Sequence, residues 1–391
     1  MPLEATTSQL VRRIVSRHQS IVSHPCIAYF ADIFMHHTHY ITRLGWAALV
    51  CTLFSQCATY HSYPHSGDPG TQSPLTGMNW RLPGIMYPES FFDVWATERS
   101  LFYYGPVRRE PGISPITQFG VLPLQGDKYL DETEVFVGAY REFLYHLSRD
   151  SADMERYLPQ LPVEVDSLYQ TNPPFFFHPV VGVSRMQAEA YCAWRGQKIN
   201  EQIQSMTEMG DSRWVDENGL MQVRMRLPTE AEWELAAGAG LDTAKYPYGY
   251  STLLQHVAFD DEDVAYLHDR YWFGRSVAQV RGELEAFEAT NHRLPVFNVF
   301  WPYAPEILQL PVPAYVYSFQ PNDLGFYHMI GNVREWVADQ PYSKGGSFLD
   351  PLVNISLQKG FEDPDGSYYL VGFRCLCELG QVPTQEAITG R

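Results

Sequence analysis

The side chains of this sequence that could do chemistry are mainly carboxylates. Five of them stand out: Glu132, Glu134, Glu230, Glu232 and Glu335. Glu232 also fits a structural role, because it follows Thr229 by three residues in a capping-box pattern, and Glu230 would suit the dipole of the same helix. Glu134 and Arg141 fit a buried pair at an earlier helix. No Ser-His-Asp order, Gly-rich phosphate loop or G-x-S-x-G motif occurs, so neither a triad of the serine-hydrolase type nor a phosphate-binding loop is predicted.

A second candidate site is the hexapeptide GNVREW, residues 331–336. The side chains of Asn332 and Glu335 and the carbonyl of Val333 would place oxygen donors in a tight turn, and hard oxygen ligands at close spacing suit Ca²⁺. The same residues also fit a plain turn, in which Asn332 caps the chain and Glu335 pairs with an arginine. The pattern leaves both interpretations open.

The third candidate is the C-x-C pair formed by Cys375 and Cys377. Thiolates are ligands for soft metal ions, so one interpretation of the pair is a metal site. An exported protein can also use two of its cysteines in a disulfide.

The composition limits the class of protein. The chain has 391 residues, a formal net charge of −17 and 14% aromatic residues. This length suits one large domain or two ordinary ones, and the aromatic content is typical of a folded body. No basic block is present that would neutralise phosphates, so nucleic acid is not predicted as a partner.

Two helices that would position the candidate residues are indicated by capping boxes. Ser184 with Gln187 predicts a helix that runs to about Gln204. Thr229 with Glu232 predicts a second helix, and the glycines that follow it predict where it ends.

The remaining elements are predicted to be short. We expect an amphipathic helix over residues 137–148 and a strand over Ala314–Phe319, where the residue types alternate. Residues 345–347 and 371–377 are expected to be short closing strands. Residues 241–310 are expected to be a long loop region with short helical pieces that makes contacts. The mixture predicts an irregular α+β fold.

The N-terminal part has features of export. Residues 44–54, LGWAALVCTLF, form an apolar run that suits a signal-peptide core and is too short to span a bilayer. Cys57 follows in LFSQC, which predicts a bacterial lipoprotein with its lipid on Cys57. An ordinary cleaved signal and a plain membrane anchor are the alternatives.

These features divide the chain into three predicted parts: a signal segment at residues 1–56, a lipid-anchored tether at 57–80, and an ordered domain at 81–391 with an insertion at about 241–310. The tether is rich in Pro, Gly and Ser, which is typical of a spacer. The first 34 residues have no signal character, so the true start is expected at Met35.

Six motifs occur in a fixed order along the chain: HPVVGVSRMQAEAYCAWRG, RMRLPTEAEWELAAGAG, YPYG, NDLGFYHMIGNVREWVAD, KGGSF and VGFRC. Together they resemble the formylglycine-generating-enzyme (sulfatase-modifying factor) domain family, over roughly Arg81 to Leu379. The resemblance implies a variant of the C-type-lectin-like fold with short strands and few helices. YLDETEVFVGAYREFLYHL and WRGQKINE are in addition similar to gliding-motility and type IX secretion lipoproteins of the K and J types.

The resemblance raises the question whether this chain has the copper site of the family's enzymes. The enzymes of this family hold copper through two cysteines between the GGS segment and the final GFR. That interval here is Phe348–Val371, and it contains no cysteine, so the resemblance implies a member without the soft ligands that Cu(I) needs. An iron-dependent branch, the sulfoxide synthases, needs histidine ligands, and the nearest candidates stand in the signal segment and tether: His36, His37, His39, His61 and His65.

The resemblance also implies structural roles. Cys192 and Cys375 take the positions of two family cysteines that pair, which implies a disulfide worth about 2–5 kcal/mol and leaves Cys377 as a lone buried thiol. Family members commonly bind a structural calcium ion at the GNVREW turn. Where the family caps the first helix with Thr-Asn, this chain has Phe136-Val137, so a cap of about 1 kcal/mol is expected to be missing.

Two functions of different classes follow as expectations. The first is a non-catalytic, structural lipoprotein on the periplasmic face of the outer membrane, part of the type IX secretion or gliding apparatus. By resemblance to the K type, it would form a ring with an N-type periplasmic partner and with copies of itself. The second is a metal-dependent oxidase, a sulfoxide-synthase-like enzyme or a ligand-binding protein of the same fold.

Overall fold

The computed structural model of the chain describes residues 114–150, 154–161, 169, 175–272, 274–290, 292–362 and 368–382. The predicted signal segment, the start at Met35, the lipidated Cys57 and the tether lie outside these residues. None of the helices that the structure describes is long and apolar enough to cross a bilayer.

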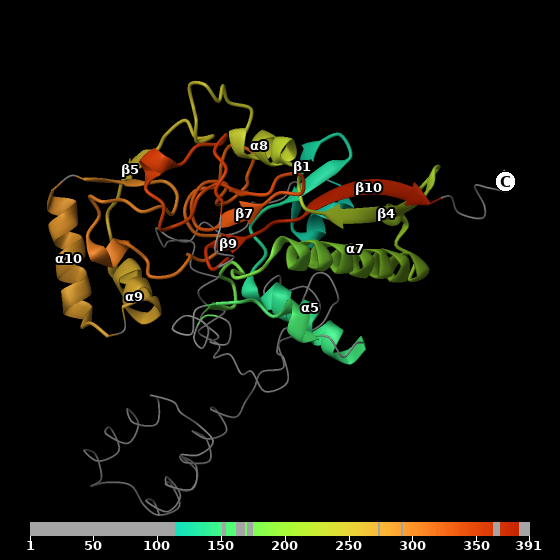
Figure 1. Cartoon of the computed structure of the whole chain (residues 1–391), viewed down its shortest axis with the longest axis horizontal. Helices are drawn as coiled ribbons and strands as arrows, with labels where there is room; N and C mark the ends of the chain where they lie inside the picture. The colour runs from blue at the N-terminus through green and yellow to red at the C-terminus, as the bar shows by residue number, and fades with distance from the viewer. Residues whose placement is uncertain are drawn as a thin grey trace, which may run out of the picture. The chain divides into compact units, whose positions relative to one another are not determined.

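The largest sheet that the structure describes is antiparallel, with the strand order β1-β2-β10-β4-β3 (Figure 1), and its side chains contribute to the hydrophobic core. Its strands are β1 (Val121–Gln125), β2 (Lys128–Asp131), β3 (Val215–Asp216), β4 (Gly219–Arg226) and β10 (Leu376–Val382). β10 is the last of them in the sequence and pairs with both β2 and β4. The sheet therefore joins the first and last described segments of the chain.

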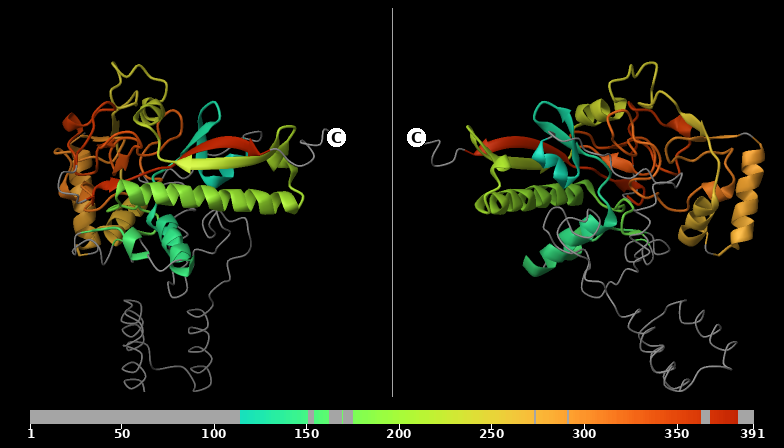
Figure 2. Two further views of the ribbon diagram at one scale, coloured as in Figure 1. Left: turned by 45° about the vertical axis from the view of Figure 1, so that its right-hand side comes forward. Right: turned by 180° about the vertical axis from the view of Figure 1, so that it is seen from behind.

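The helix α7 (Arg185–Glu208) packs alongside β4, as Figure 2 shows from two sides. Gly196 allows this approach, because a Cβ there would lie 3.1 Å from the backbone nitrogen of Met225. The Asn200 side chain binds both the N–H and the C=O of Val223, at 2.8 and 2.9 Å, as a neighbouring strand would. These bonds satisfy the β4 backbone at Val223, beyond Gly219 and Leu220, which pair with the short strand β3.

Both predicted capping boxes are formed, with Ser184 at α7 and Thr229 at α8 (Glu230–Gly238). α5 (Val137–Asp150) begins differently, because main-chain carbonyls accept hydrogen bonds from its first N–H groups. Val137 N donates to His178 O, and Gly138 N donates to Phe176 O, both at 2.8 Å. The loop at residues 176–178 thus supplies what a side-chain cap would supply.

The insertion at residues 241–310 contains more regular structure than we predict from sequence. α9 (Asp261–Arg270) and α10 (Val277–Ala289) lie side by side and share a small apolar core with residues 307–314. β5 (Leu254–His256) and β6 (Arg293–Pro295) form a two-stranded sheet next to them.

The predicted strand at Ala314–Phe319 is wrong, because these residues form turns and irregular structure. Ala314, Tyr315, Val316 and Ser318 are buried and Tyr317 and Phe319 are half-buried, so neither side of the segment is exposed to the degree that a half-solvated strand would show. The backbone of Ala314 bonds to the Asn332 side chain and not to a neighbouring strand.

A three-stranded sheet, β8-β7-β9, lies at the centre of the fold. It is built from β7 (Arg334–Trp336), β8 (Ser343–Lys344) and β9 (Val371–Gly372). The predicted closing strand at residues 345–347 is therefore displaced to β8, since Gly345 and Gly346 have φ of +86° and +75° and turn the chain.

Five short 3-10 helices complete the described elements: Pro115–Phe119, Met154–Tyr157, Ser212–Trp214, Glu306–Leu308 and Leu352–Asn354. The structure confirms the predicted fold class, an irregular α+β arrangement with short strands and few helices.

Candidate functional site

The GNVREW turn enters β7 through a backbone that only certain residues allow. Gly331 and Asn332 have φ of +79° and +57°, a region that glycine and asparagine tolerate best. A Cβ on Gly331 would lie 2.1 Å from the Asn298 carbonyl oxygen. The turn therefore sits directly against the chain at Asn298, whose carbonyl accepts from Asn332 N at 2.6 Å.

Asn332 joins three distant segments through its side chain. Its Oδ1 accepts from Asn298 Nδ2 at 3.0 Å and from Ala314 N at 2.6 Å. Its Nδ2 donates to Glu134 Oε1 at 2.9 Å and to Ala314 O at 3.3 Å. Asn332 thus caps the chain, as the plain-turn interpretation predicts.

Glu335 is paired with an arginine, as that interpretation also predicts. Arg374 donates from Nε to Oε2 at 2.8 Å and from Nη2 to Oε1 at 2.7 Å, and Trp233 Nε1 donates to Oε2 at 2.8 Å. The Arg374 side chain has no exposed surface and Glu335 only 1%. This is a fully buried, bidentate ion pair.

The donors at this turn do not fit a calcium ion. Both oxygens of Glu335 and the Oδ1 of Asn332 already accept hydrogen bonds from N–H groups. The side chain of Val333 packs against Val137, Tyr169 and Val181, which leaves the two side-chain donors to decide the question. A divalent cation on Glu335 would also stand beside the positive charge of Arg374, which it would have to displace.

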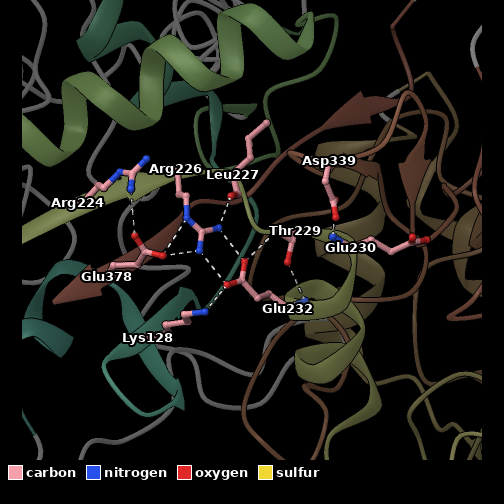
Figure 3. Close-up of polar contacts among 9 residues, drawn as sticks. All are labelled: Lys128, Arg224, Arg226, Leu227, Thr229, Glu230, Glu232, Asp339 and Glu378. Carbon is pink, nitrogen blue, oxygen red and sulfur yellow. Dashed lines mark hydrogen bonds and ion pairs between the residues drawn. The ribbon is translucent and has the colours of Figure 1, made fainter.

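The predicted carboxylates Glu230 and Glu232 occupy a polar cluster at the start of α8, shown in Figure 3. Glu232 closes the capping box and accepts from Arg226 at 2.7 and 2.8 Å and from Lys128 at 2.8 Å. The hydrogen bonds from Arg226 are the main reason that the pKa of Glu232 lies far below its ordinary value. Arg226 also reaches Glu378 of β10, so the cluster ties β2, β4, β10 and α8 together.

Glu230 serves a similar structural purpose. Its backbone N–H donates to Asp339 Oδ1 at 2.8 Å, and its Oε1 accepts from Lys344 Nζ at 2.7 Å. Lys344 is fully buried and also donates to Glu234 at 2.7 Å. The sequence reasoning missed this lysine, which is the first residue of the KGGSF motif.

The interval in which the family enzymes hold copper is filled by a different set of side chains. Asp350 accepts from Arg334 Nε and Nη2 at 3.0 and 2.9 Å and from Ser347 Oγ at 2.7 Å. Burial alone would raise the pKa of Asp350, but these hydrogen bonds outweigh it and lower the pKa. Leu352, Ile355, Leu357 and Phe361 of the same interval are buried, whereas Val353, Asn354, Gln358 and Lys359 are exposed.

The cysteines have the arrangement that the resemblance implies. Cys192 and Cys375 form a disulfide with a Cα–Cα distance of 5.9 Å, which links α7 to the start of β10. Cys377 is a free, buried thiol, and burial is the main cause that raises its pKa to about 12. A thiol with so high a pKa is a poor metal ligand, which argues against the C-x-C metal site.

Among the residues that the structure describes, no three His, Cys, Asp or Glu side chains are grouped to hold a metal ion. The candidate iron ligands His36, His37, His39, His61 and His65 lie outside the described residues. Glu134 is buried, and it contacts Asn332 in place of the predicted partner Arg141.

An open groove of about 780 Å³ runs between α7 and β4. Amide and charged side chains form much of its lining, including Gln197, Asn200, Gln204 and Arg224. None of the residues that were candidates for chemistry lies in its lining.

Comparison with known proteins supports the motif assignment. The model of the sulfatase-modifying factor enzyme 1-like domain matches residues 123–379. An "Inactive C-alpha-formylglycine-generating enzyme 2" from Bos taurus is 27% identical over 220 residues, which is 52% of this chain and 52% of that protein. A formylglycine-generating enzyme from Thermomonospora curvata is 30% identical over 230 residues, which is 51% of this chain and 56% of that protein. The chain thus spans about half the length of these curated relatives.

The solved structures that resemble the chain include PvdO from Pseudomonas aeruginosa. The match has a TM-score of 0.38 and 17% identity, and it covers 64% of this chain and 80% of PvdO.

Proposed function

The chain belongs to the sulfatase-modifying factor enzyme 1-like family, and we propose that it is a non-catalytic, structural member. The observation that carries the proposal is the content of the interval Phe348–Val371, which has no cysteine. Its partly buried polar group Asp350 is committed to Arg334 and Ser347. A Cu(I) ion needs soft sulfur ligands that this interval does not supply.

The relatives are consistent with a loss of chemistry. Proteins named as inactive members, from Bos taurus and Mus musculus, are each 27% identical to the chain. Formylglycine-generating enzymes match at a comparable level, for example 28% identity for that of Mus musculus. Overall identity therefore does not separate active from inactive members, and the proposal depends on the residues of the site.

The proposal places the protein in the type IX secretion or gliding apparatus, as a lipoprotein on the periplasmic face of the outer membrane. Support comes from the likeness of YLDETEVFVGAYREFLYHL and WRGQKINE to the K and J types and from the lipoprotein pattern at Cys57. Its partners would be an N-type periplasmic protein and further copies of the chain. A domain stabilised by a disulfide and buried ion pairs suits a load-bearing role.

The test is purification of the full chain from membranes with its anchor intact. We expect a multi-subunit assembly without stoichiometric copper or iron, measured by light scattering and elemental analysis, with co-purifying proteins identified by mass spectrometry. A Cys57→Ser variant is the control. Because it cannot carry the lipid, it should no longer be found in the membrane fraction. A monomer that carries one copper or iron per chain and oxidises a thiol-containing peptide would refute the proposal.

A further inference from the structure

The fully buried guanidinium of Arg374 has no hydrogen-bond donor left for a second carboxylate. Arg374 donates to Glu335 from Nε and Nη2 and to the Tyr327 carbonyl from Nη2 at 2.7 Å. Its Nη1 donates to the carbonyls of Asp131 and Glu132 at 3.0 and 3.4 Å. All three nitrogens are therefore engaged, and none of them reaches Glu134.

Glu134 lies beside this pair without an ionic partner of its own. Its side chain is 1% exposed. Its Oε1 accepts from the neutral amide of Asn332 at 2.9 Å, and no described protein group donates a hydrogen bond to its buried Oε2. A buried carboxylate held only by a neutral side-chain amide and by its own backbone N–H is costly to keep ionised.

The charges around Glu134 offset part of this cost but do not remove it. Arg374 attracts a negative charge on Glu134 more strongly than Glu335 repels it, and burial outweighs both charges in raising the pKa of Glu134. The phenols of Tyr169 and Tyr250 also face it, and burial raises the pKa of both.

The same segment carries two more buried acids, Asp131 and Glu132. Asp131 is paired with Arg195 at 2.6 Å and brings no cation to Glu134. Unlike Asp131 and Glu335, Glu134 makes no direct ion pair with an arginine among the described residues.

We propose that the folded protein carries a proton on Glu134, which makes the junction of Glu134, Asn298, Ala314 and Asn332 a pH-sensitive latch. Burial, the largest cause, raises the pKa of Glu134 to about 8 from an ordinary 4.5, which agrees with this geometry. The inference concerns the stability of the domain and does not depend on its proposed function.

The direction of the effect is opposite to that of an ordinary salt-bridged glutamate. Between pH 4.5 and about 8 the folded chain holds a proton that the unfolded chain has released. Stability from this group is complete below about pH 4.5 and declines until the pH passes about 8. Above that pH, Glu134 is a negative charge beside Glu335, and the latch is weakened.

The test compares the wild-type chain with Glu134→Gln, which keeps the shape and the acceptor for Asn332 but cannot ionise. The unfolding constant is measured by urea denaturation across this pH range. The ratio of wild-type to variant constants should rise on the order of tenfold per pH unit from about 5 to 8 and then level off. The exposed Glu285 of α10 provides the control, Glu285→Gln, which should leave the profile unchanged. Parallel profiles for wild type and Glu134→Gln would overturn the proposal.

A second measurement covers the case in which Glu134→Gln does not fold. The infrared carbonyl absorption of a neutral, buried carboxylic acid should be present in the wild-type protein at about pH 6 and disappear reversibly by about pH 9. The absence of this absorption at about pH 6 would equally overturn the proposal.

Discussion

Arg374 and Glu335 face each other in the interior, with the guanidinium Nε and Nη2 donating to the two carboxylate oxygens at 2.8 and 2.7 Å. The pair joins β7 to the segment between β9 and β10. Arg374 also donates to the carbonyls of Asp131 and Tyr327. The candidate carboxylate Glu335 therefore holds distant segments of the chain together through Arg374.

Removal of Arg374 should be strongly destabilising. Arg374→Ala leaves Glu335 buried without its cation, and breaking one partner of such a pair costs about 3–5 kcal/mol. Urea denaturation followed by circular dichroism measures the loss. The control is Arg224→Ala. The Arg224 side chain is 78% exposed and makes a long ion pair of 3.8 Å with Glu378, and a surface pair of this kind contributes about 0–1 kcal/mol. Equal losses for the two variants would contradict the assignment.

Calcium should have little effect on the protein. The oxygens of Asn332 and Glu335 are already hydrogen-bonded to N–H groups, so excess Ca²⁺ and a chelator should give the same melting temperature. Calorimetric titration of chelator-treated protein should show no site at this turn. A saturable rise in melting temperature with Ca²⁺ that Glu335→Gln abolishes would show that the ion displaces Arg374.

Reduction of the disulfide should lower stability. The bond between Cys192 and Cys375 closes a loop with a sequence separation of 183 residues, and loss of a native disulfide costs about 2–5 kcal/mol. Denaturation of the oxidised protein and of Cys192→Ala measures the difference, with Cys377→Ala as a control that leaves the bond intact. Peptide mapping that finds Cys375 bonded to Cys377 would refute the pairing.

His328 should make the domain sensitive to acid. Burial, the largest cause, lowers the pKa of His328 to about 3, although the hydrogen bond to the Tyr315 carbonyl opposes this. The unfolded chain binds a proton below its ordinary pKa of 6.5 that the folded chain does not. The contribution of this residue to stability is therefore complete above pH 6.5 and lost as the pH falls toward 3.

The variant His328→Asn isolates this effect, since asparagine tolerates the φ of +52° at this position. The ratio of the wild-type unfolding constant to that of the variant should rise on the order of tenfold for each pH unit by which the pH is lowered below about 6.5. Glu134 acts in the opposite direction over part of this range, so the ratio is informative and the wild-type profile alone is not. A ratio that is flat with pH would show that His328 does not titrate in this way.

Two glycines in helices should respond to alanine in opposite ways. A Cβ on Gly138 in α5 would lie 2.1 Å from the Phe176 ring, whereas nothing lies within 4 Å of one on Gly282 in α10. Gly138→Ala should cost about 1–3 kcal/mol through overpacking. Gly282→Ala should instead stabilise by about 0.5–1 kcal/mol, because glycine is a poor helix former. Thermal denaturation distinguishes the two, and a stabilised Gly138→Ala variant would contradict the packing of α5 on the loop at Phe176.

Local signals in the sequence predicted some elements well. The capping boxes at Ser184 and Thr229 locate the starts of α7 and α8 because their bonds join residues only three positions apart. The same signal is present at α10, where Ser276 and Gln279 form a capping box. That helix was therefore predictable, and reading residues 241–310 as mainly loop missed it.

Other expectations failed because they depend on burial. The alternation at Ala314–Phe319 suggests a half-exposed strand, but most of the segment is buried and its backbone bonds to Asn332. The missing cap of α5 is replaced by carbonyls near His178, some forty residues along the chain. A sequence pattern reports neighbours in the chain and not the groups that folding brings to them.

The sequence by itself determined that the copper cysteines are absent from Phe348–Val371 and that the two capped helices form, since both follow from residue identity and short spacing. Only the tertiary structure decided what the oxygen donors of the GNVREW turn do. Glu335 meets Arg374 and Asn332 meets Glu134 across 39 and 198 residues of sequence. Whether a buried carboxylate holds a metal ion, an arginine or a proton depends on which groups folding places within hydrogen-bonding distance of it.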